Sequence, residues 1–207
     1  MSDDEATTGT GASGAGDGAS RSAGEAAAER YRRLAAGFTT VVEAIDDRNR
    51  DEPSPCEGWS AAEVVGHVVR TERDLLERSG RPVGGAPDVA DDALGAWAST
   101  RDAVQAALDD EAFADAERDG PFGPTSFAST VDTFMSFDLL VHRWDLARAI
   151  GRDDLAELDP GDVAVARDRL APMGDAVRSP GVFGPEAEVA PDAPDVDRFL
   201  AWTGRRP

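Results

Sequence analysis

Both histidines of the chain lie in segments with helical periodicity, and one of them follows a carboxylate by one turn. His142 comes four residues after Asp138 in SFDLLVHRWDLARAIG, residues 136–151, so both side chains project from one helix face. That face is apolar, and a buried carboxylate must be protonated, paired or bound to a metal. His67, the other histidine, lies at the margin of the apolar face of residues 60–80. Facing helices of a bundle would bring the three side chains together.

Two imidazoles and one carboxylate form the donor set of a catalytic metal site. Three protein ligands leave a position open for water or substrate, which is typical of catalytic rather than structural zinc. The same trio suits ferrous iron, manganese or nickel, so the residues specify the ligands better than the metal. We therefore expect His67, Asp138 and His142 to hold a divalent metal. A ferritin-like di-iron centre is excluded, because neither histidine has a glutamate three residues before it.

The residues around this trio also have plain structural interpretations. A histidine beside an apolar face is more often a core or surface residue than a ligand. Asp138 has Arg143 and Arg148 as alternative partners, although both arginines point away from its face of the helix. Asp145, three residues after His142, suits either an acceptor for the imidazole or an ion-pair partner of Arg148.

Four further residues near the motifs are accounted for without chemistry. Glu63 follows Ser60 by three residues, which is the spacing of a capping box at a helix start. Trp59 and Trp144 are interpreted as packing residues. Cys56 precedes a helix N-terminus, where a thiol can become reactive, but a small hydrophobic residue in a loop is the simpler interpretation.

Composition limits the class of protein and its partners. The chain has 207 residues, of which 41% are hydrophobic, enough for one core but with no apolar run long enough to span a membrane. The net charge of -20 disfavours nucleic acid as a partner, because phosphates would be repelled. A single cysteine excludes an internal disulfide and a cysteine-rich zinc site. The start of the chain lacks the features of a secretory signal, so we expect a cytoplasmic protein.

The hydrophobic periodicity predicts an all-α fold. Four long amphipathic helices indicate an antiparallel four-helix bundle with short loops, followed by a shorter fifth helix with Asp159 as N-cap and Pro160 at its first position. The predicted segments are a disordered acidic Gly/Ser tail at 1–22, a metal-binding bundle at 23–152 and a C-terminal extension at 153–207. The bundle helices are expected at 26–47, 61–79, 91–111 and 127–151. In the extension we expect an irregular stretch at 181–195, suited to a short strand pair, and a last helical turn or two near 196–202.

Two motifs resemble the metal-binding, N-terminal domain of mycothiol-dependent maleylpyruvate isomerase, within the DinB-like superfamily. They are SPCEGWSAAEVVGHVV and DLLVHRWDLARAIG, and the ending FGPEAEVAPDAPDVDRFLAWTGRRP is similar to that of short members of the group. The resemblance implies a four-helix bundle and a divalent metal, zinc in the isomerase. It also implies that this metal is held by residues at the positions of His67, Asp138 and His142.

The chain departs from the isomerase in two respects. Its acidic ligand position carries aspartate, Asp138, where the isomerase has glutamate, and the residues after Gly151 are too few for the second domain that contributes to the isomerase's active site. The resemblance thus implies a metal site more strongly than one particular reaction.

Three functions agree with these observations. The first is a metal-dependent thiol transferase or isomerase, acting on small electrophiles with a low-molecular-weight thiol as co-substrate. The second is a metal-binding protein without turnover. The third is a helical interaction module that forms a homodimer. None of them involves nucleic acid or a membrane.

Overall fold

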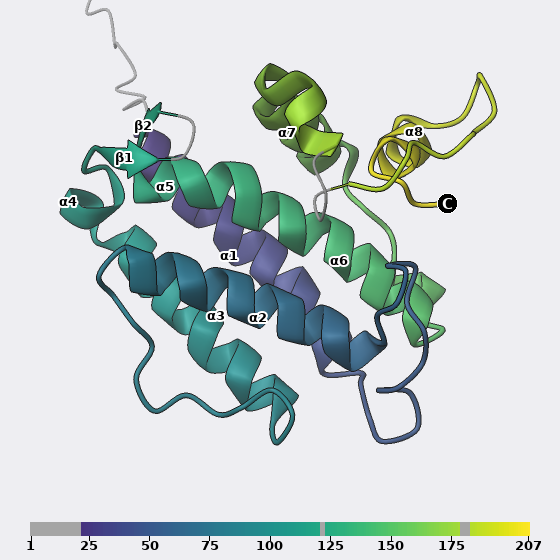
Figure 1. Cartoon of the computed structure of the whole chain (residues 1–207), viewed down its shortest axis with the longest axis horizontal. Coiled ribbons are helices and arrows are strands. Elements are labelled where there is room, and N and C mark those ends of the chain that lie inside the picture. The colour runs from purple at the N-terminus through teal and green to yellow at the C-terminus, as the bar shows by residue number, and fades with distance from the viewer. Residues whose placement is uncertain (1–21, 121–122, 179–182) are drawn as a thin grey trace, which may run out of the picture.

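The computed structural model describes residues 22–120, 123–178 and 183–207, and it confirms the all-α fold (Figure 1). Four long helical segments form a bundle, and the C-terminal helices α7 and α8 cover one side of it. The expected tail lies outside the described residues, except for Ser22, which caps the first helix.

Each of the first two helices begins with a capping box, of which only the one at Ser60 was predicted; the first helix begins at Ala23 and not at residue 26. Helix α1 spans Ala23–Val42 and α2 spans Ala61–Arg78. In each, the N-cap serine accepts a hydrogen bond from the backbone of the glutamate three residues later, whose side chain accepts one from the serine backbone. These reciprocal bonds satisfy donors that a helix start otherwise leaves free. Because α2 begins at a defined residue, the face of the helix on which His67 lies is also defined.

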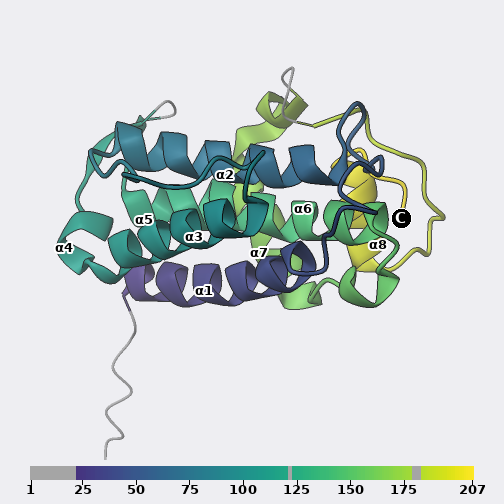
Figure 2. The same ribbon diagram turned by 90° about the horizontal axis from the view of Figure 1, so that it is seen from below.

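Helices α2 and α3 run in the same direction, which corrects the expectation of a fully antiparallel bundle with short loops. Helix α3 spans Ala93–Asp109, and the connection from α2 passes back along the length of the bundle before α3 begins (Figures 1 and 2). Arg81, just after α2, pairs with Asp110, just after α3, so the two helix ends lie together. Periodicity cannot reveal this topology, because it reports which face is buried and not the helix direction.

A short helix and a hairpin connect α3 to the last bundle helix. Helix α4 spans Glu111–Ala114, and strands β1, Arg118–Gly120, and β2, Gly123–Thr125, pair antiparallel. The expected strand pair is absent from the described residues 183–195. The small sheet therefore lies before the fourth helix and not in the C-terminal extension.

The fourth bundle helix contains a π-helical turn. It begins as α5, Phe127–Thr130, continues through the π-turn η1, Val131–Met135, and ends as α6, Ser136–Ala149. A π-turn adds a residue to a helical turn, so the part before Ser136 is rotated relative to a regular helix. Asp138 and His142 both lie in the regular part of the helix, after this turn.

The C-terminal extension packs against α6 and closes around an aromatic cluster. Its elements are η2, Asp153–Leu155, α7, Pro160–Leu170, η3, Ala171–Arg178, and α8, Asp195–Trp202. Asp159 caps α7 with Pro160 at its first position, as predicted. Aromatic rings of Phe137, Phe183, Phe199 and Trp202 contact one another between α6 and α8. Helix α6 is consequently buried on most sides, with Trp144 among its packed residues, as expected.

Candidate metal centre

The three candidate ligands meet between α2 and α6. One nitrogen of each histidine and one carboxylate oxygen of Asp138 all lie within 4.8 Å of one another. The Nε2 atom of His67 is 3.5 Å from Oδ2 of Asp138, and the two imidazole centroids are 5.0 Å apart. The side chains of His67 and Asp138 are 27% and 20% exposed, so the group is reached by solvent. The donor set fits a divalent cation with open coordination positions.

Trp59 forms one wall of this group. Its ring centroid lies 4.7 Å from that of His67 and 6.1 Å from that of His142. The indole also packs against the hydrophobic core, as the sequence predicted. Trp59 thus has a second role that its position before the helix did not reveal, because its indole packs close to both imidazole rings.

The other side of the His142 ring faces a second, fully bonded cluster. Its Nδ1 atom is 2.9 Å from Oδ2 of Asp145, whose side chain has no exposed surface. Arg205 donates to both oxygens of Asp145, at 3.2 Å to Oδ1 and 2.8 Å to Oδ2. The Cys56 thiol lies 3.1 Å from Asp145 Oδ2 and accepts from Arg205 at 3.1 Å.

This second cluster also has metal-ligand residue types, but a cation already occupies it. Cys56, His142 and Asp145 have ligand atoms within 4.8 Å of one another. The guanidinium of Arg205 contacts both the carboxylate and the sulfur, and its side chain is only 11% exposed. The open group of His67, Asp138 and His142 is therefore the better candidate metal centre.

The charges of the second cluster shift the pKa values of its members. Burial raises the pKa of Asp145, but the hydrogen bonds from His142 and Arg205 outweigh it and lower the pKa to about 2. Burial lowers the pKa of His142, but the bond to Asp145, the Cys56 contact and nearby carboxylates raise it to about 10. Because Asp145 is ionised, Nδ1 of His142 must donate the hydrogen bond. With its pKa raised to about 10, His142 also carries a proton on Nε2 near neutral pH, and this proton must leave before Nε2 can bind a metal.

The structure decides between the alternatives left open for the two aspartates. Asp145 accepts a hydrogen bond from the imidazole and pairs with Arg205 instead of Arg148, which binds Asp153. In the described part of the chain, no arginine pairs with Asp138, whose ion-pair contact is with His67.

Two residues of the site escaped the sequence interpretation. Cys56 was expected as a hydrophobic loop residue, and Arg205 was assigned no role. Arg205 lies 60 residues after Asp145 and 149 after Cys56, and no periodic pattern connects positions so far apart. The only available signal was that the Pro-Cys-x-Gly-Trp motif places Cys56 beside the histidine helix.

A third buried carboxylate lies deeper in the bundle. Glu72 of α2 is 1% exposed, and its Oε2 accepts a hydrogen bond of 2.9 Å from the Tyr31 hydroxyl. Its Oε1 has no hydrogen-bond partner among the described residues. Burial, together with the charge of Asp138 and against the Tyr31 bond, raises the pKa of Glu72 to about 8. Glu72 is therefore neutral in the folded state over the lower part of the physiological pH range.

The comparison with protein families agrees with this geometry. The model described as mycothiol maleylpyruvate isomerase N-terminal domain matches residues 31–147, more than half of the chain. The chain belongs to this family. The match confirms the predicted membership of the DinB-like superfamily of metal-binding domains. It covers α2 and nearly all of α6, which carry the three candidate ligands, and ends before the segment that carries Arg205.

Two curated relatives extend the likeness beyond the matched domain. Both are described as uncharacterized proteins, from two strains of Mycobacterium tuberculosis, and each is 27% identical over 183 residues. The alignment covers 84% of this chain and 95% of each relative. No solved structure matches the chain significantly. Among the residues that the structure describes, no helix is both long and apolar enough to cross a bilayer.

Proposed function

We propose that the chain is a metal-dependent enzyme that transfers or isomerises a small electrophile with the help of a low-molecular-weight thiol. One observation carries the proposal. The two imidazoles and the Asp138 carboxylate converge within 4.8 Å at a solvent-reached position, inside a metal-binding family whose name refers to a thiol and an isomerase. The proposed metal is zinc, and the proposed location is the cytoplasm.

His67, Asp138 and His142 are the proposed ligands. A divalent cation held by them would supply Lewis acidity, which lowers the pKa of a coordinated thiol. The shorter side chain of Asp138, compared with the glutamate of the isomerase, sits near enough to His67 to share a cation with it, at 3.5 Å between Oδ2 and Nε2. Three protein ligands leave space for a small molecule.

The surrounding residues orient this group. Asp145 accepts a hydrogen bond from Nδ1 of His142, so Nε2 is the nitrogen that would bind the metal. Arg205 neutralises Asp145 and holds both of its oxygens. The Trp59 indole packs close to both imidazoles and adds an apolar surface to the group.

Elemental analysis of protein without a histidine tag tests the metal site. Wild-type protein should contain close to one divalent metal per chain, and Asp138→Ala and His142→Ala should lose it. Asp153→Ala is the matched control, because Asp153 is 72% exposed and its ion pair among the described residues is with Arg148. Wild-type protein that stays metal-free after incubation with zinc, iron, manganese and nickel would refute the proposal.

Catalysis needs a separate measurement. The metal-loaded protein should consume a thiol in the presence of epoxides, maleyl compounds or haloaromatics, and Asp138→Ala should not. Retention of metal without any thiol consumption would instead identify a binding protein. If the Asp138→Ala and His142→Ala variants change neither metal content nor ligand binding, the interaction module is the better description.

A further inference from the structure

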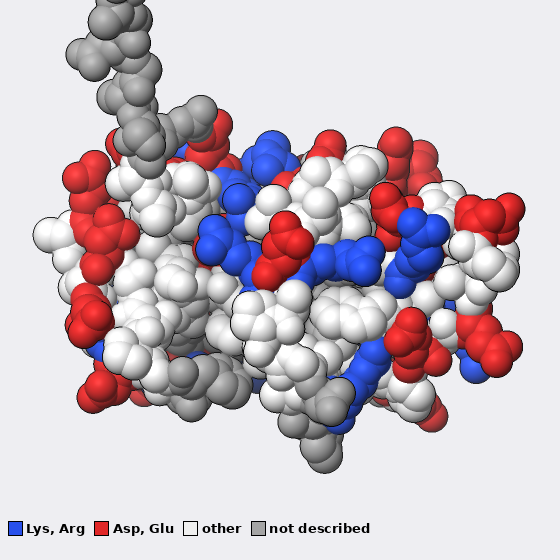
Figure 3. All heavy atoms as spheres, turned by 90° about the horizontal axis from the view of Figure 1, so that it is seen from above, with Lys and Arg blue, Asp and Glu red and all other residues white. Residues whose placement is uncertain are grey.

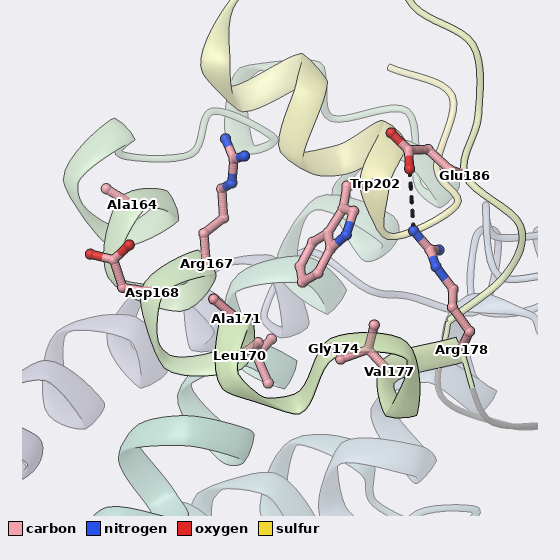
Figure 4. A pocket seen from close by; sticks show the side chains of 10 residues that line it. All are labelled: Ala164, Arg167, Asp168, Leu170, Ala171, Gly174, Val177, Arg178, Glu186 and Trp202. Atoms are coloured by element: carbon pink, nitrogen blue, oxygen red, sulfur yellow. Dashed lines mark hydrogen bonds and ion pairs between the residues drawn. The ribbon is translucent and has the colours of Figure 1, made fainter.

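A cavity of about 670 Å³ lies in the C-terminal extension, and it contains none of the proposed metal ligands. It is bounded by α7, η3 and α8, with Glu186 at one edge (Figure 4). Cavities of a few hundred cubic ångströms are the size that takes small molecules. The family match ends at residue 147, so this cavity lies wholly outside the matched domain.

The cavity carries an unpaired cation. Arg167 of α7 is exposed and has no hydrogen bond or ion pair within the described part of the chain. In Figure 4 its side chain and the Trp202 ring line the same cavity, whereas the carboxylate of Asp168 points to the side away from Trp202. A free guanidinium at the edge of a cavity is able to bind an anionic group of a ligand through charge-assisted hydrogen bonds.

A second arginine lies on the opposite side of Trp202. Arg178 donates to the Gly184 carbonyl at 2.7 Å and lies 3.4 Å from a Glu186 oxygen. Its guanidinium carbon is 6.0 Å from the Trp202 centroid. Arg178 is thus held in place and largely neutralised, which leaves Arg167 as the free positive group of the cavity. Figure 3 shows arginine side chains gathered across the face formed by α7 and α8, between acidic ones.

The remaining lining combines apolar side chains with the carboxylates of Asp168 and Glu186, of which Glu186 pairs with Arg178. Trp202 is partly exposed and packs against the core from α8. Leu170 and Val177 are each 3% exposed and form the floor (Figure 4). A planar apolar group would cover the indole and this floor, while an anionic group on the same molecule would meet Arg167.

We propose that this cavity binds a small aromatic monocarboxylate, with its carboxylate on Arg167 and its ring against Trp202. A neutral analogue of the same shape would keep the ring contact and lose the charge-assisted hydrogen bonds. The proposal does not depend on metal binding, because neither Arg167 nor Trp202 belongs to the metal centre.

Benzoate and its neutral isostere benzamide are the probes, titrated against the whole chain and followed by NMR. The indole N–H signal that is missing in Trp202→Phe identifies Trp202, and benzoate should shift this signal. Benzoate should bind at least about tenfold more tightly than benzamide, as expected for hydrogen bonds to a charged group. Arg167→Gln should reduce this preference to less than about twofold, because it removes the charge and keeps most of the side-chain length.

Two controls separate this site from others. Arg198→Gln removes an exposed arginine of α8 that pairs with Asp195 outside the cavity, and it should leave the preference unchanged. Asp138→Ala should also bind benzoate as the wild type does, whether or not the metal proposal holds. Equal binding of the two probes, an unmoved Trp202 signal, or an equal loss in Arg198→Gln would each overturn the proposal.

Discussion

The two sides of the His142 imidazole are built in opposite ways. On the Nδ1 side, Arg205 and Cys56 contact Asp145 and each other within 3.2 Å, and the Asp145 side chain has no exposed surface. On the other side, His67 and Asp138 meet at 3.5 Å and remain partly exposed. The comparison teaches that similar residue types make either a closed support or an open receptor for a cation. Arg205 determines the difference, because its guanidinium takes the place of a metal cation on the Nδ1 side.

Asp145→Asn should disrupt the cluster of Asp145, Arg205 and Cys56, and it should lower the free energy of unfolding more than any other substitution predicted below. It leaves the buried Arg205 and His142 without their counter-charge, and removing one partner of a buried ion pair costs about 3 to 5 kcal/mol. The free energy of unfolding, measured with urea, should fall by this amount. Asp153→Asn, in an exposed pair with Arg148, should cost less than about 1 kcal/mol. Similar losses in the two variants would show that the closed side contributes no special stability.

Arg205→Gln tests whether the two sides of His142 are linked. It should weaken metal binding, although Arg205 is not one of the proposed ligands. Residues that orient metal ligands typically contribute about 10-fold to 100-fold in affinity. Competition with a chelator should show a loss in this range, and Arg205→Lys should recover part of it, because lysine keeps the charge but not the forked geometry. Arg206→Gln, in the exposed neighbouring residue, serves as the control. If wild-type protein binds metal and Arg205→Gln binds it equally well, Arg205 has only a structural role.

Most of the fold follows from local sequence signals. The capping box at Ser60 and the Asp159–Pro160 start were predicted because they depend on residues three or fewer apart. The capping box at Ser22 was missed, because residue 22 was assigned to the tail and the first helix was expected to begin at residue 26. The parallel course of α2 and α3 is not readable in this way, because it depends on the path of residues 79–92. The π-turn at Val131–Met135 has no clear sequence signal either, since both helix types bury an apolar face.

The residues of the candidate site also divide into those that local spacing predicts and those that it does not. The Asp138 and His142 pair follows from a spacing of four residues, and the phase of α2 brings His67 to face it. Arg205 reaches the site from the chain's far end through tertiary packing of α8 against α6, which leaves no pattern in the sequence. Local spacing thus predicted the open side and offered Asp145 as one acceptor for the His142 imidazole, and only the three-dimensional structure reveals the contacts of Arg205 and Cys56.

Glu72 offers the sharpest contrast with Asp145, because it is a buried carboxylate without any cation. The pKa of Glu72 is raised from 4.5 to about 8 in the folded chain, so the folded state binds a proton that the unfolded state releases. Stability from this group is complete below pH 4.5, and it declines as pH rises to about 8. The wild type should therefore lose up to about 1.4 kcal/mol per pH unit in this window relative to Glu72→Gln.

The measurement is the free energy of unfolding at several pH values for both proteins, compared as a difference. The glutamine still accepts the Tyr31 hydroxyl hydrogen bond through its carbonyl, so any remaining cost of the substitution should not vary with pH. Glu77→Gln, in an exposed residue of α2, should show the wild-type pH dependence. A difference between wild type and Glu72→Gln that stays constant from pH 5 to pH 8 would mean that Glu72 ionises normally, which requires water or a cation at its Oε1.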